Sequence, residues 1–238
     1  MNNSCHQVKS KRRVADHGEV FTAEREVKAM CDLVGGMCDD YSKRFLEPAC
    51  GNGNFLAEIV ERKLQSLKKK YGRSAYDFER FSVFAMTSVY GVDILSDNVN
   101  ECQKRLYGIW EKFYKAVCKK ECNDETKAAV KFILSQNILC GNALTLMCVD
   151  DNQQDINIPI IFPEWSVIGS TSLKRRDFRL DVLLKVGEKP SENEQMSIVD
   201  DESDVLQYLT QNPVTGEYIA QPIREFPAVN YRRLCEHA

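Results

Sequence analysis

The sequence predicts an α/β fold with a doubly wound, mostly parallel sheet. Three short apolar runs, at residues 44–47, 89–94 and 138–140, are each followed by small or polar residues. The longer segments between these runs carry apolar residues three and four positions apart, which is the spacing of amphipathic helices. Strands that alternate with helices in this way pair in parallel, and the connecting helices then cover both faces of the sheet.

The first expected elements are two helices with a short strand between them. Residues 23–37 have helical spacing, and residues 44–47 form the strand, which ends at Glu47. Residues 54–70 predict an amphipathic helix that ends in three lysines, where positive charge suits the negative end of the helix dipole. Glu47 is therefore expected at the carboxyl end of the first strand, just before a loop and a helix N-terminus.

The remaining expected elements continue the alternation. In chain order they are a helix over 76–88, a strand over 89–94, a long helix from Asp97 to Val117, a helix over 126–136, and strands over 138–140 and 159–162. Asp97 is the expected N-cap of the long helix, because its side chain can accept a hydrogen bond from an N–H of the first turn. After about Trp165 the pattern weakens.

We expect three regions along the chain. Residues 1–20 are polar and are expected to form a flexible N-terminal segment. Residues 21–185 form the α/β domain. Residues 186–238 are expected to be an irregular extension, because residues 187–204 are acidic and polar and the rest contains turn signals with little periodicity.

Composition narrows the class of protein. The chain has 238 residues, of which 43% are hydrophobic, which is enough for one sizeable core. A net charge of −3 does not favour nucleic-acid binding by this chain alone. The basic clusters at 9–13, 68–70 and 174–176 are more typical of solvated faces than of phosphate contacts.

The cysteines indicate a reducing compartment. The ten cysteines are scattered, and no second Cys or His pair accompanies Cys118 and Cys122 at zinc-site spacing. We therefore expect reduced thiols in a cytoplasmic protein and no metal. No apolar run approaches the roughly 20 residues of a membrane helix, and no secretory signal is visible, so no membrane association is expected.

Polar or small residues mark three strand ends. In the loop after Glu47, Gly51 and Gly53 allow a ligand to approach bare backbone. Asp93, at the end of the next strand, can accept hydrogen bonds from ribose hydroxyls, and the amide of Asn142 can pair with a purine edge. Each feature alone has a plain alternative: a tight turn, a helix cap or an ordinary loop. Together, and in this order, they favour a nucleoside site.

These motifs resemble a known family. Residues 45–55, FLEPACGNGNF, closely resemble the S-adenosylmethionine loop of amino DNA methyltransferases, mainly the adenine-N6 enzymes of restriction-modification systems. Residues 17–22 resemble the segment that packs on the methionine part of the cofactor in those enzymes. Residues 90–94 and 141–144 look like the next two motifs, although the family usually has Asp in place of Asn142. The resemblance covers about residues 12–145 and implies a Rossmann-like class I methyltransferase core that binds S-adenosylmethionine.

The resemblance also implies a set of cofactor contacts. They are Phe21 and Thr22 over the methionine end; Glu47, Pro48, Ala49, Cys50, Gly51, Asn52 and Gly53 along the methionine and ribose, followed by Asn54 and Phe55; Asp93 on the ribose and Ile94 on the adenine; and Asn142 with Ala143 at the adenine edge. A nicotinamide dehydrogenase fits less well, because far more than about 20 residues separate Gly53 from Asp93 and Leu56 replaces the third glycine of the dinucleotide motif.

The catalytic motif of that family is not recognisable. The family has Asn/Asp-Pro-Pro-Tyr/Phe after its fourth strand, where it orients and stacks on a flipped base. This chain has no Pro-Pro pair. The best positional candidates are Pro163, Glu164 and Trp165, of which Glu164 can accept a hydrogen bond and Trp165 can stack. The alternative interpretation is a buried strand followed by a proline turn.

Three functional hypotheses follow. The leading one is a DNA adenine-N6 methyltransferase, or its cofactor-binding subunit, that acts on DNA together with a partner polypeptide supplying the base-binding motif. The second is a complete small methyltransferase that uses residues 162–165. The third is a catalytically inactive S-adenosylmethionine-binding subunit with a regulatory or assembly role.

Overall fold

The computed structural model describes Arg13, residues 22–186 and residues 203–237. Phe21, most of the N-terminal segment 1–20 and the stretch 187–202 lie outside the described residues. The predictions made for them therefore have no structural counterpart.

The first part of the chain builds a parallel sheet. Its elements are α2 (Glu24–Leu33), η1 (Gly35–Asp39), β1 (Phe45–Glu47), α3 (Asn54–Tyr71), α4 (Ala75–Met86), β2 (Val89–Asp93), α5 (Ser96–Cys118), η2 (Lys119–Glu121), α6 (Asp124–Asn137) and β3 (Ile138–Cys140). The strand order is β1-β2-β3, with Leu46 beside Tyr90 and Val92 beside Leu139. The predicted mixed α/β fold with a parallel sheet is confirmed at this level.

The second part is antiparallel. Its elements are β4 (Met147–Val149), β5 (Asp155–Pro159), β6 (Ile161–Ile168), β7 (Ser172–Arg179), α7 (Leu180–Leu184), α8 (Ser203–Leu206), β8 (Leu209–Gln211), β9 (Tyr218–Ala220), β10 (Arg224–Glu225), β11 (Val229–Asn230) and η3 (Tyr231–His237). β6 and β7 form a long hairpin, and β10 and β11 both pair with β7.

The hairpin replaces the predicted fourth parallel strand. Residues 159–162 were expected to extend the parallel sheet, but β6 pairs in antiparallel register with β7 over its whole length, from Ile161 beside Arg179 to Ile168 beside Ser172. A turn at Gly169, with φ of 63°, reverses the chain between the two strands. Within the described ranges, the parallel sheet therefore has three strands.

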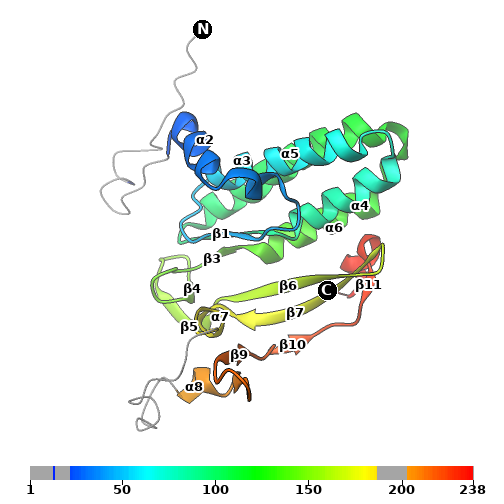
Figure 1. The fold of residues 1–238 in the computed structure, drawn as a ribbon. Helices are drawn as coiled ribbons and strands as arrows, with labels where there is room; N and C mark the ends of the chain where they lie inside the picture. Colours follow the sequence, from blue (N-terminus) through cyan, green and yellow to red (C-terminus); the bar gives the residue numbers. More distant parts are fainter. Residues whose placement is uncertain (1–12, 14–21, 187–202, 238) are drawn as a thin grey trace.

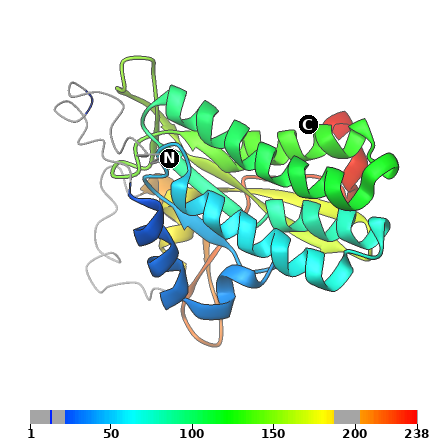
Figure 2. The same ribbon diagram turned by 90° about the horizontal axis from the view of Figure 1, so that it is seen from above.

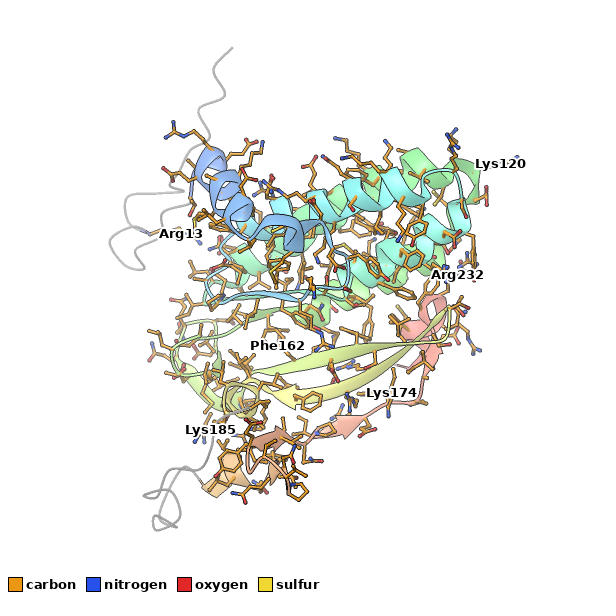
Figure 3. All side chains as sticks on the ribbon, viewed as in Figure 1. Arg13, Lys120, Phe162, Lys174, Lys185 and Arg232 are labelled. Atoms are coloured by element: carbon orange, nitrogen blue, oxygen red, sulfur yellow. The ribbon has the colours of Figure 1, made fainter. Side chains whose placement is uncertain are left out.

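The layers follow from this topology. Figure 1 shows helices α3 to α6 on one side of β1 and β3 and the hairpin of β6 and β7 on the other, and from above these helices cover the hairpin strands (Figure 2). Tyr90 of β2 joins the sheet to the hairpin, because its hydroxyl donates to the Pro163 carbonyl at 2.9 Å and its ring packs on Phe162. Figure 3 places Phe162 between the two sheets. The face of the parallel sheet opposite α3 and α5 is thus covered by strands, where helices were expected.

Two helices have side-chain caps, and the one cap that the sequence analysis predicted is not among them. Ser74 caps α4 and Asn123 caps α6, each accepting a backbone N–H of the first turn. The predicted cap at Asp97 is wrong, because α5 begins at Ser96 and Leu95 occupies the cap position. Asp97 lies in the first turn instead, where its carboxylate pairs with Arg13.

A buried lysine fixes the chain just before β1. The side chain of Lys63 on α3 is fully buried, and its ammonium donates to the carbonyls of Asp40 and Lys43 at 2.6 and 2.7 Å. Its nitrogen also lies 5.1 Å from the centre of the Phe45 ring. Burial lowers the pKa of Lys63 from 10.5 to about 8, because the interior disfavours the charged form.

A buried glutamate fixes the C-terminal segment to the helices. Glu79 of α4 is almost fully buried and accepts hydrogen bonds from the hydroxyls of Tyr114 and Tyr231, both at 2.6 Å. Asn123 and Arg232 donate to the same carboxylate at 2.9 and 2.8 Å. Arg232 lies where the C-terminal segment meets the helical layer (Figure 3). Four donors from three elements therefore converge on one buried charge.

We expect Glu79→Ala to lower the free energy of unfolding by about 2–4 kcal/mol, because it leaves buried hydroxyls and an arginine without their acceptor. Urea denaturation measures this change. The matched control is Glu24→Ala in α2, whose carboxylate forms an exposed pair with Lys28 and whose loss should leave the midpoint unchanged. Equal midpoints for both variants would contradict the role assigned to Glu79.

Lys63 predicts a pH dependence. Its pKa is lower in the folded state, so between about pH 8 and 10.5 the unfolded chain binds more protons, and the contribution of Lys63 to stability rises with pH. The unfolding free energy of the wild type minus that of Lys63→Met should therefore increase by about 1–2 kcal/mol from pH 8 to pH 10. Denaturant titrations of both proteins at each pH measure the difference. Parallel pH profiles would refute the assignment.

Candidate functional site

A cavity of about 450 Å³ opens at the carboxyl ends of the three parallel strands. Every predicted cofactor residue that the structure describes lines this cavity, except Gly53. They are Thr22, Glu47, Pro48, Ala49, Cys50, Gly51, Asn52, Asn54, Phe55, Asp93, Ile94, Asn142 and Ala143. The structure therefore brings together residues from four separate stretches of the sequence, and Phe21 falls outside the described residues.

The loop between β1 and α3 needs its glycines. Gly51 and Gly53 have φ angles of 53° and 85°, a region that other residues rarely adopt. Gly53 is also the cap position of α3, and a Cβ there would lie 2.6 Å from the sulfur of Cys102 on α5. Gly53 does not line the cavity itself, but it allows the loop that does so to pack closely against α5.

Asp93 organises the floor of the cavity. One carboxylate oxygen accepts the N–H of Gly51 at 2.9 Å. The other accepts the N–H of Leu95 at 2.9 Å and the side-chain amide of Asn98 at 3.1 Å. Since a carboxylate has about four acceptor sites, the oxygen bound to Gly51 keeps one free for a ligand hydroxyl.

Glu47 gives the cavity a second carboxylate. It is partly buried at the end of β1, and burial raises the pKa of its carboxyl above the ordinary value, while a hydrogen bond from the Ala49 N–H acts in the opposite direction. Among the described residues that line the cavity there is no lysine, arginine or histidine. The site is therefore suited to a ligand that carries positive charge.

Thr22 is held at the mouth of the cavity by the start of α3. The side-chain amide of Asn54 donates to the Thr22 carbonyl at 3.0 Å, and its oxygen accepts from Arg105 of α5 at 2.5 Å. The first residue of α3 therefore ties the chain before α2 to the rim of the site.

Asn142 lies on the far wall of the cavity, after β3. Its side-chain oxygen accepts the N–H groups of Leu144 and Thr145 at 3.0 and 3.4 Å, so that oxygen already shapes the turn. The amide nitrogen is 3.3 Å from a carboxylate oxygen of Asp155. For a ligand at this wall, Asn142 is a better donor than acceptor.

Sequence reasoning missed some residues that line the cavity. They are Leu95, Asn98, Gly141 and Leu144. Gly141 and Leu144 belong to the motif after β3 that the sequence had marked. Asn98 lies in the first turn of α5, five residues after Asp93, and no sequence motif marked it.

The candidate catalytic residues lie elsewhere. Trp165 is buried against Phe132, and its indole N–H donates to Asn137 at 2.9 Å. Glu164 pairs with Arg44 and Arg176, and the Pro163 carbonyl accepts from Tyr90. None of the three lines the cavity. The structure thus favours the buried strand of the alternative interpretation, but not its proline turn, because Pro163 lies within β6 and pairs with Asp177.

The basic clusters at 68–70 and 174–176 do not line the cavity, whereas of the cluster at 9–13 the structure describes only Arg13, which donates to the cavity residue Asn98 at 3.3 Å. Lys174 pairs with Glu225, and Arg175 pairs with Asp177. The lysines at 68–70 lie in the last turn of α3, which is about 27 Å long, whereas its first turn faces the cavity. Any nucleic acid that reaches this cavity therefore needs contacts beyond these clusters.

Two further findings concern the described residues. They contain no group of three or more His, Cys, Asp or Glu side chains placed to hold a metal ion. None of their helices combines the length and the hydropathy required to cross a bilayer.

Comparisons with known proteins give no family assignment. No protein-family model matches the chain, and neither a curated protein nor a solved structure is significantly similar to it. Functional inference therefore depends on the geometry of the site.

The loop geometry makes a prediction. Gly53→Ala should lower the free energy of unfolding by about 2–4 kcal/mol, through the positive φ and the overlap with Cys102. Gly108→Ala is the matched control, since that glycine lies in α5 with nothing within 4 Å of the added methyl and should become slightly more stable. Thermal or urea unfolding gives both values, and a Gly53→Ala protein as stable as wild type would disprove the close packing.

Proposed function

We propose that this chain binds S-adenosylmethionine through a Rossmann-like methyltransferase core and serves as the cofactor-binding subunit of a DNA adenine-N6 methyltransferase. The observation that carries the proposal is the cavity at the ends of β1, β2 and β3, which gathers the residues of the family-like motifs. A ligand crevice at the carboxyl ends of parallel strands is the usual site of nucleotide binding in α/β folds.

The charge of the cavity favours this cofactor over a nucleotide phosphate. Glu47 and Asp93 contribute two carboxylates, and no basic side chain lines the cavity among the described residues. A dinucleotide or nucleoside triphosphate would bring two or more negative charges close to both carboxylates. S-adenosylmethionine instead offers a sulfonium and an ammonium group. Its single carboxylate suits the N-terminus of α3, where free N–H groups and the helix dipole attract negative charge.

The geometry supports individual contacts for this cofactor. The ribose hydroxyls donate to Asp93, whose Gly51-bound oxygen keeps an acceptor site. The ammonium group lies near Glu47, whose partly buried carboxylate gains a compensating charge. The adenine ring lies between Ile94 and Ala143, and its ring nitrogens accept from the amide of Asn142.

A partner polypeptide supplies the groups that orient the target base. Trp165 and Glu164 are occupied in the core and in ion pairs, and neither lines the cavity. A flipped adenine needs acceptors for its amino hydrogens and a ring to stack on, directly next to the methyl group. The buried or paired state of these residues equally suits a subunit without chemistry, with a regulatory or assembly role. We propose the cytoplasm as its location, because all nine described cysteines are free.

The cofactor assignment predicts a calorimetric result. S-adenosylmethionine and S-adenosylhomocysteine should bind the purified chain, and Asp93→Ala should weaken binding by about ten- to a hundredfold, since it removes charged hydrogen bonds to the ribose. The matched control is Asp151→Ala, an exposed carboxylate outside the cavity, which should bind like wild type. The fold of each variant is checked by its unfolding midpoint.

Two outcomes would contradict the proposal. If neither compound gives a heat of binding, or if a dinucleotide binds more tightly, the assignment of S-adenosylmethionine as the cofactor is refuted. Methyl transfer to DNA by the purified chain alone would leave the cofactor in place but refute the need for a partner.

A further inference from the structure

The two edges of the parallel sheet differ. β1 pairs with β2 through Phe45 and Glu47, so the backbone N–H and C=O of Leu46, between them, point away from the sheet. In the described part of the chain, no strand pairs with that edge. At the opposite edge, the outward carbonyl of Ile138 accepts a hydrogen bond from the Gln103 side chain at 2.8 Å. A side chain therefore covers one outward carbonyl at the β3 edge, whereas the β1 edge has no pairing strand among the described residues.

Apolar cavities flank the open edge on both faces. On the hairpin side, a cavity of about 300 Å³ lies between Leu46, Phe178 and Leu184. On the helix side, a cavity of about 220 Å³ lies between Leu46, Met30 and Val34. Leu46, Met30 and Leu184 are 43%, 51% and 55% exposed, which is high for large apolar side chains that lie this close together.

This arrangement defines the chemistry of an occupant. An added strand would pair with the N–H and C=O of Leu46, and its successive side chains would point alternately into the two cavities. Both cavities are mainly apolar, so the strand needs apolar residues on both of its faces. Such a strand is typical of the buried middle of a sheet and is rarely stable alone.

The undescribed segments of this chain do not have that character. Residues 1–12, 14–21 and 187–202 contain no run of more than two consecutive apolar residues. The stretch 187–202 carries five glutamates and aspartates within its last eleven residues. None of these segments therefore offers an apolar strand for this edge.

We propose that the open edge of β1 is the docking site for one β-strand of a different polypeptide, with apolar side chains on both faces. Glu47 and Phe55 line both the helix-side cavity and the cofactor cavity, so one end of the added strand reaches that site. This last step rests on the proposed function, because it identifies where the base-binding partner joins the site. Strand addition to an exposed edge is a common mode of recognition.

A synthetic peptide tests the edge directly. The probe is a fluorescein-labelled nonapeptide with five central valines and isoleucines and two lysines at each end. Its fluorescence anisotropy should rise and saturate with wild-type protein. Leu46→Pro should weaken binding by about tenfold or more, because it removes the outward N–H while the hydrogen bonds of Phe45 and Glu47 to β2 remain. The same peptide with its five central amides N-methylated should not bind.

Leu46→Lys serves as a second variant in case the proline variant does not fold, and it should also weaken binding by about tenfold or more. Val214→Lys is the matched control, since Val214 is 90% exposed in the turn between β8 and β9, and it should bind like wild type. Hydrogen exchange at the Leu46 amide should slow when the peptide binds.

Several results would overturn the proposal. The proposal fails if the wild type does not bind the peptide, if the Leu46 variants bind it equally well, or if the N-methylated peptide binds. It also fails if light scattering shows a dimer that Leu46→Lys abolishes, because the edge would then bind a second copy of this chain. S-adenosylmethionine titration of Leu46→Lys separates the two proposals. If the cofactor binds Leu46→Lys but the peptide binds neither this variant nor the wild type, only the docking site is refuted. If the peptide binds the wild type but the cofactor binds neither protein, the proposed function is refuted.

Discussion

The carboxylate of Asp93 holds together the segments that form the cavity. It accepts from Gly51 in the loop after β1 and from Leu95 and Asn98 at the start of α5. The N–H of Cys50 adds a bond of 2.8 Å to the Val92 carbonyl of β2. These bonds bring two loops together over the end of one strand, and the space they leave is the cavity. The same carboxylate thus holds the two loops together and lines the cavity.

The sequence predicts most elements of the parallel-sheet part of the chain, because the residues that determine each element lie close together in the sequence. Glycines at positive φ, apolar residues at helical spacing and a carboxylate at a strand end act within a few residues of one another. The predicted strand over 138–140 coincides with β3, and the predicted helix over 54–70 differs from α3 by one residue. Thirteen of the described cofactor candidates line one cavity, because the loops that carry most of them follow parallel strands whose carboxyl ends meet at one edge of the sheet. Asn98 was not predicted, because its place in the cavity depends on its hydrogen bond to Asp93 across the turn before α5.

The hairpin was not predictable in this way. Charged residues of β7 pair across strands, as Arg176 does with Glu164, or along the strand, as Arg175 does with Asp177. In the sequence these residues look like a solvated basic cluster. Trp165 likewise looks available for stacking until its hydrogen bond to Asn137 on α6 is known. A single sequence states which residues carry charge or rings, whereas the partners that neutralise or bury them are set by the tertiary fold.

The hairpin also explains why the sheet remains open. It packs on the face of the parallel sheet, through Tyr90 and Phe162, and so buries side chains that point out of the sheet plane. The outward N–H and C=O of Leu46 lie within that plane, so packing on the face cannot satisfy them. Because Glu47 follows Leu46 directly and lines the cavity at the strand ends, a molecule that pairs with this edge would also contact that cavity. Because β1 has only three residues, the proposed assembly at its edge and the proposed binding in the cavity would be coupled.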